Sequence, residues 1–267
     1  MRLILTGATG LVGSATLSHI LSLPQEQIPR LYILSRSPVP MAENRPNVTV
    51  IEHKNFNEYS PELLKELKGA DGCIWAQGIS QSQVSAEHVL HKIIDIQDFS
   101  LIVYREYVKI TLDYPLAAAE AFSTLSDSFN FVYVSGEGAT QSPGRFTPIF
   151  GRVKGECETS LIALAKRYPS LKPYSVRPGY VDPQNDPNVL KHILQRPDQQ
   201  VMLKKTVRGV LAPVFRAAYA KGVSPTEHLG RFLTGLATGD GKPMEGEGVS
   251  GGGWILSNVA FRRLAGL

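Results

Sequence analysis

Three glycines spaced three residues apart follow the first apolar run of the chain. Residues 3–5 lead into Thr6-Gly7-Ala8-Thr9-Gly10-Leu11-Val12-Gly13, and an amphipathic pattern then continues to residue 22. An apolar strand, a tight glycine turn and a helix in this order open a βαβ unit. Gly7 permits the turn, and Gly13 permits the helix to pack closely on the strand. The N-terminal segment therefore predicts an α/β fold built on a parallel sheet.

The chain up to residue 180 continues to alternate short apolar runs with longer helical patterns. Short apolar runs bounded by Gly, Pro, Ser or Asp are typical of strands that are covered on both faces. The expected strands are residues 3–5, 31–34, 48–51, 73–75, 131–134 and 174–176. The expected helices are about 11–22, 61–67, 105–125 and 150–167. This order predicts a doubly wound parallel sheet, the Rossmann arrangement.

Beyond Pro183 the pattern changes to short helical stretches near 187–195, 199–221 and 226–237. The run GDGKPMEGEGVSGGG follows, and its glycines are typical of a surface loop. We interpret residues 1–267 as a single Rossmann-type domain. Within it, residues 181–267 form a small C-terminal subregion that is expected to lie on the substrate side.

Composition narrows the class of protein further. A length of 267 residues suits one α/β domain, and 43% hydrophobic with 19% charged residues argues against extended disorder. Two cysteines, Cys73 and Cys157, exclude a disulfide framework and a multi-cysteine zinc module. Apolar runs fall short of the roughly 20 residues that a membrane helix needs. A cytoplasmic protein without an integral membrane segment is therefore expected.

The net charge of +4 comes from one segment of the chain. Residues 201–226 carry five basic residues and no acidic one, namely Lys204, Lys205, Arg208, Arg216 and Lys221. This segment has no aromatic platform, so nucleic-acid binding is not predicted. A solvated face over the core is the ordinary interpretation, and contact with an acidic partner or a membrane surface is the alternative. His88 and His91 lack a third ligand nearby, so no metal site is predicted.

The glycine turn and the end of the second expected strand together indicate a dinucleotide site. Gly10 lets backbone N–H groups approach a pyrophosphate, which the helix N-terminus also stabilises. A glycine turn without a ligand is the alternative. The second strand ends Leu34-Ser35-Arg36-Ser37, where an acidic residue would bind the 2′-hydroxyl of NAD. Arg36 suits a 2′-phosphate instead, so NADP is preferred and NAD is left open.

These features together resemble the extended and atypical short-chain dehydrogenase/reductase superfamily. The likeness is greatest to NAD(P)-binding proteins of the Tat-interacting-protein-30 and NmrA type and their fungal relatives. It covers most of the chain and rests on TGATGLVG, Arg36, Ala76-Gln77-Gly78, Val134-Ser135-Gly136, Lys154 and Arg177-Pro178-Gly179. The resemblance implies a Rossmann fold and NAD(P) binding.

The resemblance also implies a cofactor role for each matching position. Pyrophosphate contacts fall on Thr6, Gly7, Thr9, Gly10, Leu11, Val12 and Gly13. Arg36 would bind the 2′-phosphate, and Asn55-Phe56 stands where relatives place an acidic and an apolar residue beside the adenine. The adenosine and its ribose would be lined by Ala76, Gln77 and Gly78, and the nicotinamide side by Pro178 and Gly179.

The catalytic residues are where this chain departs from the superfamily pattern of Ser, Tyr and Lys. Ser135 and Lys154 match, but Phe150 stands four residues before the lysine in place of the tyrosine. Phenylalanine has no exchangeable proton, so the standard acid/base step cannot run through it. Another donor is one solution: the candidates are Tyr133, Glu137, Tyr107, Tyr180 or a water held by Ser135. Binding of NADP(H) by a regulatory or sensor protein, and non-redox isomerase or epimerase-like chemistry, are the others.

The leading hypothesis is an NADP(H)-dependent oxidoreductase that acts on a small carbonyl or alcohol. In it, Ser135 polarises the substrate oxygen and Lys154 binds the nicotinamide ribose. A homodimer is left open. Residues 88–105 form an apparent insertion relative to the resembling proteins. Three interpretations of this insertion are left open: a lid over the site, an extension without function, or a translated intron.

Overall fold

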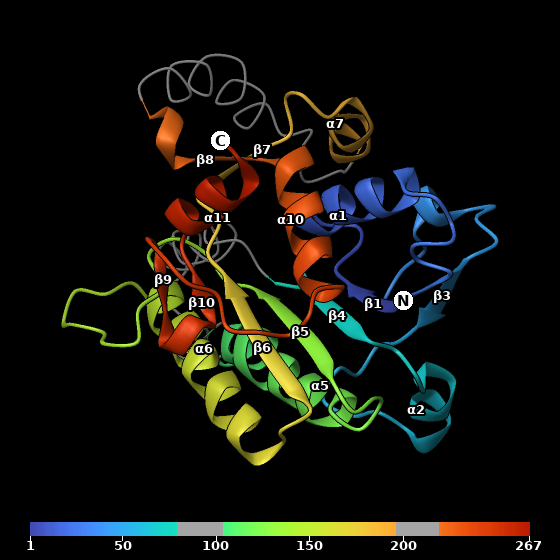
Figure 1. The fold of residues 1–267 in the computed structure, drawn as a ribbon, viewed down its shortest axis with the longest axis horizontal. Helices are drawn as coiled ribbons and strands as arrows, with labels where there is room; N and C mark the ends of the chain where they lie inside the picture. The colour runs from blue at the N-terminus through green and yellow to red at the C-terminus, as the bar shows by residue number, and fades with distance from the viewer. Residues whose placement is uncertain (79–103, 196–218) are drawn as a thin grey trace, which may run out of the picture.

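The computed structural model describes residues 1–78, 104–195 and 219–267. Its centre is a sheet of eight strands in the order β3-β2-β1-β4-β5-β6-β10-β9 (Figure 1). All neighbouring strands are parallel except β9 and β10. The strands are β1 Arg2–Thr6, β2 Arg30–Ser35, β3 Val48–Glu52, β4 Gly72–Trp75, β5 Phe129–Val134, β6 Leu171–Val176, β9 Val249–Ser250 and β10 Ile255–Leu256. A separate parallel pair joins β7 Tyr180–Asp182 to β8 Val223–Pro225.

Helices cover both faces of the sheet. One face carries α1 Leu11–Ser22, α10 Thr226–Ala237 and α11 Asn258–Ala265, with α7 Pro187–Leu194 beside α1 (Figure 1). The other face carries α2 Pro61–Leu67, α5 Tyr114–Phe122 and α6 Ile149–Arg167. A π-helical turn, Lys109–Asp113, runs directly into α5. Among the helices that the structure describes, none has both the length and the apolar character needed to cross a bilayer.

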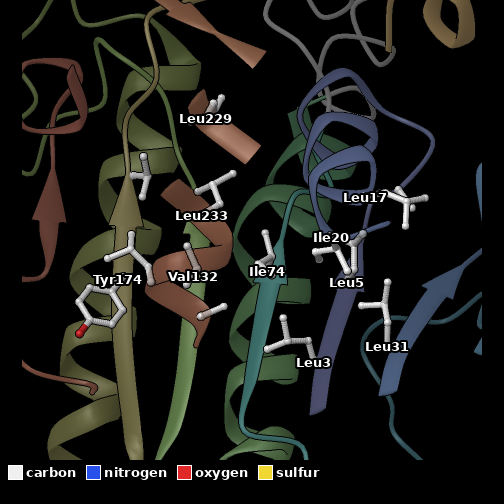
Figure 2. Packing of buried hydrophobic residues seen from close by; sticks show 14 of the residues in the cluster. Leu3, Leu5, Leu17, Ile20, Leu31, Ile74, Val132, Tyr174, Leu229 and Leu233 are labelled. Atoms are coloured by element: carbon white, nitrogen blue, oxygen red, sulfur yellow. The ribbon is translucent and has the colours of Figure 1, made fainter. Parts of the chain in front are cut away.

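The strands divide their side chains between two hydrophobic clusters. Leu3 and Leu5 of β1 pack with α1 and α10, as Figure 2 shows, while Ile4 between them faces the α5 side. In β4, Ile74 faces α10 and Trp75 faces the opposite cluster. This alternation follows from the two-residue repeat of a strand, and it explains why both kinds of position are apolar in a doubly covered sheet.

The predicted doubly wound sheet is confirmed, and all six predicted strands are present. The first two predicted helices have the bounds of α1 and α2. The C-terminal strands were not predicted: β9 lies inside the glycine-rich run, and β10 extends the central sheet. Most of the segment 88–105, including both histidines, lies outside the described residues, as does most of the basic segment 201–221.

Two glycines in helices provide a matched test of packing. A Cβ on Gly155 of α6 would lie 1.8 Å from the carbonyl oxygen of Thr140, whereas no described atom lies within 4 Å of a Cβ on Gly235 of α10. Gly155→Ala is therefore expected to lower the free energy of unfolding by about 2–3 kcal/mol through overpacking. Gly235→Ala is expected to raise it by up to about 1 kcal/mol, because alanine favours a helix. Urea denaturation of both variants measures the two changes, and equal changes would contradict this packing.

Candidate functional site

The strand order places a topological switch point between β1 and β4. Chain connections from β1 lead through β2 to β3, whereas β5 and β6 extend the sheet on the other side of β4. Thr6 at the end of β1 is paired with Trp75 at the end of β4, so the loops that follow these strands leave the sheet side by side. Ligands of doubly wound sheets bind at this crevice beyond the carboxyl ends of the strands.

The predicted glycine turn has the geometry that only glycine allows. Gly7 has φ +69°, and a Cβ there would lie 2.4 Å from the carbonyl oxygen of Ala76. A Cβ on Gly13 would lie 1.9 Å from the carbonyl oxygen of Gly7. The turn is closed by Gly10, whose N–H donates to the carbonyl oxygen of Gly7 at 2.9 Å. The turn therefore packs so closely against the segment after β4 and against the start of α1 that no side chain fits at Gly7 or Gly13.

Unpaired polar groups surround this turn. Within the described residues, no side chain caps the first turn of α1, which begins after Gly10. Thr6 Oγ1 and Gln77 Nε2 are buried and have no hydrogen-bond partner in the part of the chain that the structure describes. A buried donor left unpaired costs about 1–3 kcal/mol. A polar ligand with anionic oxygens would satisfy both side chains and the free N–H groups of α1, so the residues present fit a dinucleotide pyrophosphate.

Helix α7 closes one side of the turn, which the sequence did not predict. His192 Nε2 lies 3.4 Å from the carbonyl oxygen of Thr9. Val189 and Ile193 pack against Ala15, and Leu11 joins this small cluster. The side chain of Leu11 therefore serves packing between α1 and α7, and its contribution to a ligand would come from its backbone.

Of the residues predicted to bind the adenine side of the dinucleotide, Arg36 and Asn55 are exposed and Phe56 is buried. Arg36 is exposed directly after β2. Asn55 is also exposed, and its Oδ1 accepts a hydrogen bond from the N–H of Asn57 at 3.2 Å. Phe56 is only 1% exposed and packs its ring against Trp75 and Tyr114. The ring of Phe56 is part of the core, so a contact of this residue with an adenine would come from its backbone, and that contact stays a prediction.

The backbone of Pro178 and Gly179, which follow β6, forms hydrogen bonds with neighbouring segments. The carbonyl oxygen of Pro178 accepts a hydrogen bond from the N–H of Glu137 at 3.0 Å. The N–H of Gly179 donates to Ser224 Oγ at 3.0 Å, and a Cβ on Gly179 would lie 2.2 Å from the carbonyl oxygen of Gly222. This corner therefore joins the loop after β5 to β8, and these two backbone groups already have partners.

A buried charge network lies where the two predicted catalytic residues meet. Ser135 Oγ donates to Glu158 Oε1 at 2.6 Å, and Arg177 Nε donates to the same oxygen at 2.8 Å. Lys154, one turn before Glu158 on α6, donates from Nζ to the carbonyl oxygen of Ser135 at 2.7 Å. The structure thus brings Ser135 and Lys154 together, as predicted. The hydroxyl hydrogen of Ser135 is directed to Glu158, and the polarising role of this hydroxyl stays a prediction.

Glu158 and the side-chain role of Arg177 were missed by sequence reasoning. Glu158 is fully buried, on a helix face that it shares with Val153, Cys157 and Leu161. An acidic residue at an apolar position of a helix was the available signal, because such a residue is seldom buried without a cationic partner. Arg177 provides that partner, and the hydrogen bonds to Glu158 raise its pKa further.

The pKa of Lys154 is shifted towards neutral pH. Burial lowers the pKa of its ammonium from 10.5 to about 8, against the opposing influence of Cys157 and Glu158. Desolvation has this direction for a cation because it disfavours the charged form. A group with a pKa near the working pH is suited to general acid/base chemistry.

The alternative proton donors differ in their surroundings. Tyr133 is buried and donates to the carbonyl oxygen of Thr111 at 3.1 Å, and burial raises its pKa well above the ordinary value. Burial also raises the pKa of Tyr107 to about 12. Glu137 Oε1 accepts from the N–H of Asn258 at 2.6 Å, at the start of α11. Tyr180 is partly exposed on β7.

Phe150 itself lies on the same side of α6, four residues before Lys154. The Cζ atom of its ring would be 2.9 Å from a Cβ on Gly138 and is the ring atom nearest to that position. The tip of the ring therefore points at the loop after β5. Within the described ranges, no group of three or more His, Cys, Asp or Glu side chains is placed to hold a metal ion.

Solved structures with the same fold include short-chain dehydrogenases and a dTDP-glucose 4,6-dehydratase. A dTDP-glucose 4,6-dehydratase from Streptomyces venezuelae with NAD bound superposes with a TM-score of 0.60 at 14% identity, covering 100% of this chain and 79% of that one. A short chain dehydrogenase/reductase from Saccharomyces cerevisiae gives a TM-score of 0.60 at 16% identity, covering 96% and 95% of the two chains. Both similarities support the Rossmann fold.

Two curated proteins are similar in sequence, and no family model matches the chain. Botcinic acid biosynthesis cluster B protein 16 of Botryotinia fuckeliana (strain B05.10) is 42% identical over 160 residues, which are 57% of this chain and 98% of that protein. Leucinostatins biosynthesis cluster protein T of Purpureocillium lilacinum is 32% identical over 281 aligned residues, which span 98% of this chain and 94% of that protein. The chain therefore belongs to the family of leucinostatins biosynthesis cluster protein T.

Proposed function

We propose that the protein is an NADP(H)-dependent oxidoreductase that acts on a small carbonyl or alcohol and uses Lys154 to hold the exchanged proton. The observation that carries the proposal is the pair of unpartnered groups, Thr6 Oγ1 and Gln77 Nε2, beside the uncapped start of α1. The names of the two sequence relatives refer to biosynthesis clusters. A tailoring step on an intermediate of such a cluster is the role that this context supports.

The residues of the chain then have separate tasks. Thr6 and the N–H groups after Gly10 bind the pyrophosphate, and Arg36 pairs with the 2′-phosphate. When bound, the dinucleotide supplies or accepts the hydride. Lys154 holds the proton that a carbonyl oxygen takes up during reduction, and it accepts that proton in the reverse direction.

Glu158 and Arg177 act through Ser135 and not on the substrate. Arg177 holds the carboxylate of Glu158, and this carboxylate accepts the hydroxyl hydrogen of Ser135. The carbonyl oxygen of Ser135 binds Lys154 Nζ. The network therefore fixes the position of the ammonium. Because its members interact directly, a change in one of them is expected to alter the behaviour of the others.

A non-catalytic NADP-binding regulatory protein is the second candidate. Two observations favour it: Phe150 replaces the usual tyrosine, and the hydroxyl of Ser135 is directed to Glu158. The two candidates differ in turnover and not in binding. A screen of carbonyl substrates that follows NADPH absorbance separates them, because only the enzyme consumes NADPH in the presence of a substrate.

Removal of the Arg36 side chain tests the choice of dinucleotide. Arg36→Ala is expected to weaken NADPH binding by about tenfold or more and to leave NADH binding within about twofold, since a charged hydrogen bond contributes about 1.5–3 kcal/mol. Isothermal titration calorimetry with both dinucleotides measures this difference.

Arg45→Ala is the matched control for Arg36→Ala. Arg45 precedes β3 at the amino edge of the sheet, whereas Arg36 follows β2 at the carboxyl edge. Equal loss of NADPH affinity in both variants would contradict a 2′-phosphate contact at Arg36. Failure of the wild-type protein to bind either dinucleotide would contradict the whole proposal.

A further inference from the structure

A cavity of about 440 Å³ lies on the α10 and α11 face of the sheet. It is bordered by α10, by the end of α11 and by the segment that follows α10, which crosses in front of β5 and β6 (Figure 1). Its volume falls within the range of small-molecule sites, about 300–1,000 Å³. Figure 2 shows Tyr174, which forms its floor, projecting from β6.

This cavity is separate from the dinucleotide site. The carbonyl oxygens of Leu236 and Gly239, both cavity residues, accept hydrogen bonds from Asn130 Nδ2 at 3.0 and 2.9 Å. Asn130 is the second residue of β5, so the cavity lies towards the amino edge of the parallel strands. The glycine turn and Lys154 lie at the carboxyl ends of the strands. A ligand here would therefore not compete for the dinucleotide crevice.

The lining of the cavity is mostly apolar. Phe232, Leu236, Met244 and Leu264 are among its lining residues. The ring of Phe232 packs edge-on against Phe261 with ring centroids 5.4 Å apart. Such a surface suits an aliphatic or aromatic body, because burial of apolar area drives its binding.

The polar groups around the cavity differ in whether they already have partners. The hydroxyl of Tyr174 donates to the carbonyl oxygen of Lys242 at 2.6 Å, and Asp240 pairs with Lys242 at 2.9 Å. In contrast, Arg231 is 57% exposed and reaches Glu227 only at 3.8 Å. His228 Nδ1 is buried without a hydrogen-bond partner in the described part of the chain.

The groups left to recognise a ligand are therefore a cation and an imidazole. The carboxylate of Asp240 already pairs with Lys242 at 2.9 Å, whereas the guanidinium of Arg231 is exposed and only 3.8 Å from its carboxylate partner, so it can also bind an anion. An anionic head beside Arg231 would place an attached apolar body against Phe232 and Leu236, which follow it on α10.

We propose that this cavity is a second binding site, which takes a compact amphipathic anion: an aromatic or aliphatic body with one carboxylate or sulfonate. The assignment stands independently of the proposed oxidoreductase activity, because it depends on other residues at the opposite edge of the sheet.

Two naphthalene probes that differ in charge test the site. The probes are 1-anilinonaphthalene-8-sulfonate and its uncharged counterpart N-phenyl-1-naphthylamine, and fluorescence titration measures their binding. Wild-type protein is expected to bind one equivalent of the sulfonate. Arg231→Gln is expected to weaken the sulfonate by about tenfold and the neutral probe by less than about twofold. Arg167→Gln, at the end of α6 on the other face of the sheet, is the matched control and is expected to change neither.

A second variant fills the cavity without disturbing the backbone. Gly235 lines the cavity, and no described atom lies within 4 Å of a Cβ placed on it. Gly235→Phe is therefore expected to weaken both probes by about tenfold or more, while the urea midpoint does not fall below that of wild type and NADPH affinity is unchanged. Unchanged probe affinity in Gly235→Phe would overturn the site. An equal effect of Arg231→Gln on both probes would overturn its preference for anions.

Discussion

Glu158→Ala is expected to lower the free energy of unfolding by about 3–5 kcal/mol, the cost of leaving a buried charge without its partner. Glu158 is completely buried, and the side chain of Arg177 is 17% exposed. Loss of the carboxylate leaves this guanidinium unpaired, and it also removes the acceptor of the Ser135 hydroxyl. Urea denaturation at neutral pH, followed by circular dichroism, measures the change.

Two further variants separate charge burial from the loss of side-chain volume. Glu227→Ala removes an exposed carboxylate that lies 3.8 Å from Arg231, and it is expected to cost less than about 0.5 kcal/mol. The double variant Glu158→Met with Arg177→Met is expected to recover much of the loss, because neither charge remains buried. If Glu158→Ala costs no more than Glu227→Ala, the pair does not anchor this part of the fold.

The strands and helices of the Rossmann core could be predicted because their signals are local. A short, fully apolar run such as residues 31–34 is typical of a strand that is buried on both faces. The helices α1 and α2 begin at Leu11 and Pro61, directly after residues that favour helix starts. The strands β9 and β10 have two residues each and exist because β6 offers a free edge. Two residues are too short to show a sequence pattern, so the pairing of β10 with β6 could not be predicted.

The candidate site was predictable to a different degree at each position. The glycine turn is encoded locally, and the structure gives its glycines the close contacts expected of them. The resemblance assigns Ser135 and Lys154 to one catalytic set, but it cannot show that Glu158, one turn after Lys154, binds Arg177 directly after β6. The packing of the Phe56 ring could not be predicted for the same reason, since it depends on Trp75 and Tyr114, which are distant in sequence.

Carbonyl reduction by the wild-type protein is expected to be constant below a pH of about 8 and to fall about tenfold per pH unit above it. The reason is that Lys154 carries the required proton only below its pKa. Lys154→Met is expected to lower kcat by at least about 100-fold, the usual contribution of an acid/base group. The pH dependence of kcat, measured with a saturating ketone and NADPH, gives the position of the fall.

Lys154→Arg distinguishes proton transfer from electrostatic binding. Arginine keeps the positive charge, but its pKa above about 12 prevents it from releasing a proton at neutral pH. It is therefore expected to lose kcat while binding NADPH within a few-fold of wild type. A variant that keeps kcat, or a wild-type profile that stays flat between pH 7 and 10, would contradict the role of Lys154.

The titration of Lys154 can also be measured without any substrate. Its pKa is lowered in the folded state, so between about 8 and 10.5 the unfolded chain binds a proton that the folded protein does not. Stability is then expected to rise with pH across this window, because the unfolded state carries more protons there. Lys154→Met should lose this part of the pH dependence, whereas Lys166→Met at the exposed end of α6 should keep it. Because this result is independent of turnover, it separates a misassigned proton donor from a protein whose substrate was missing from the screen.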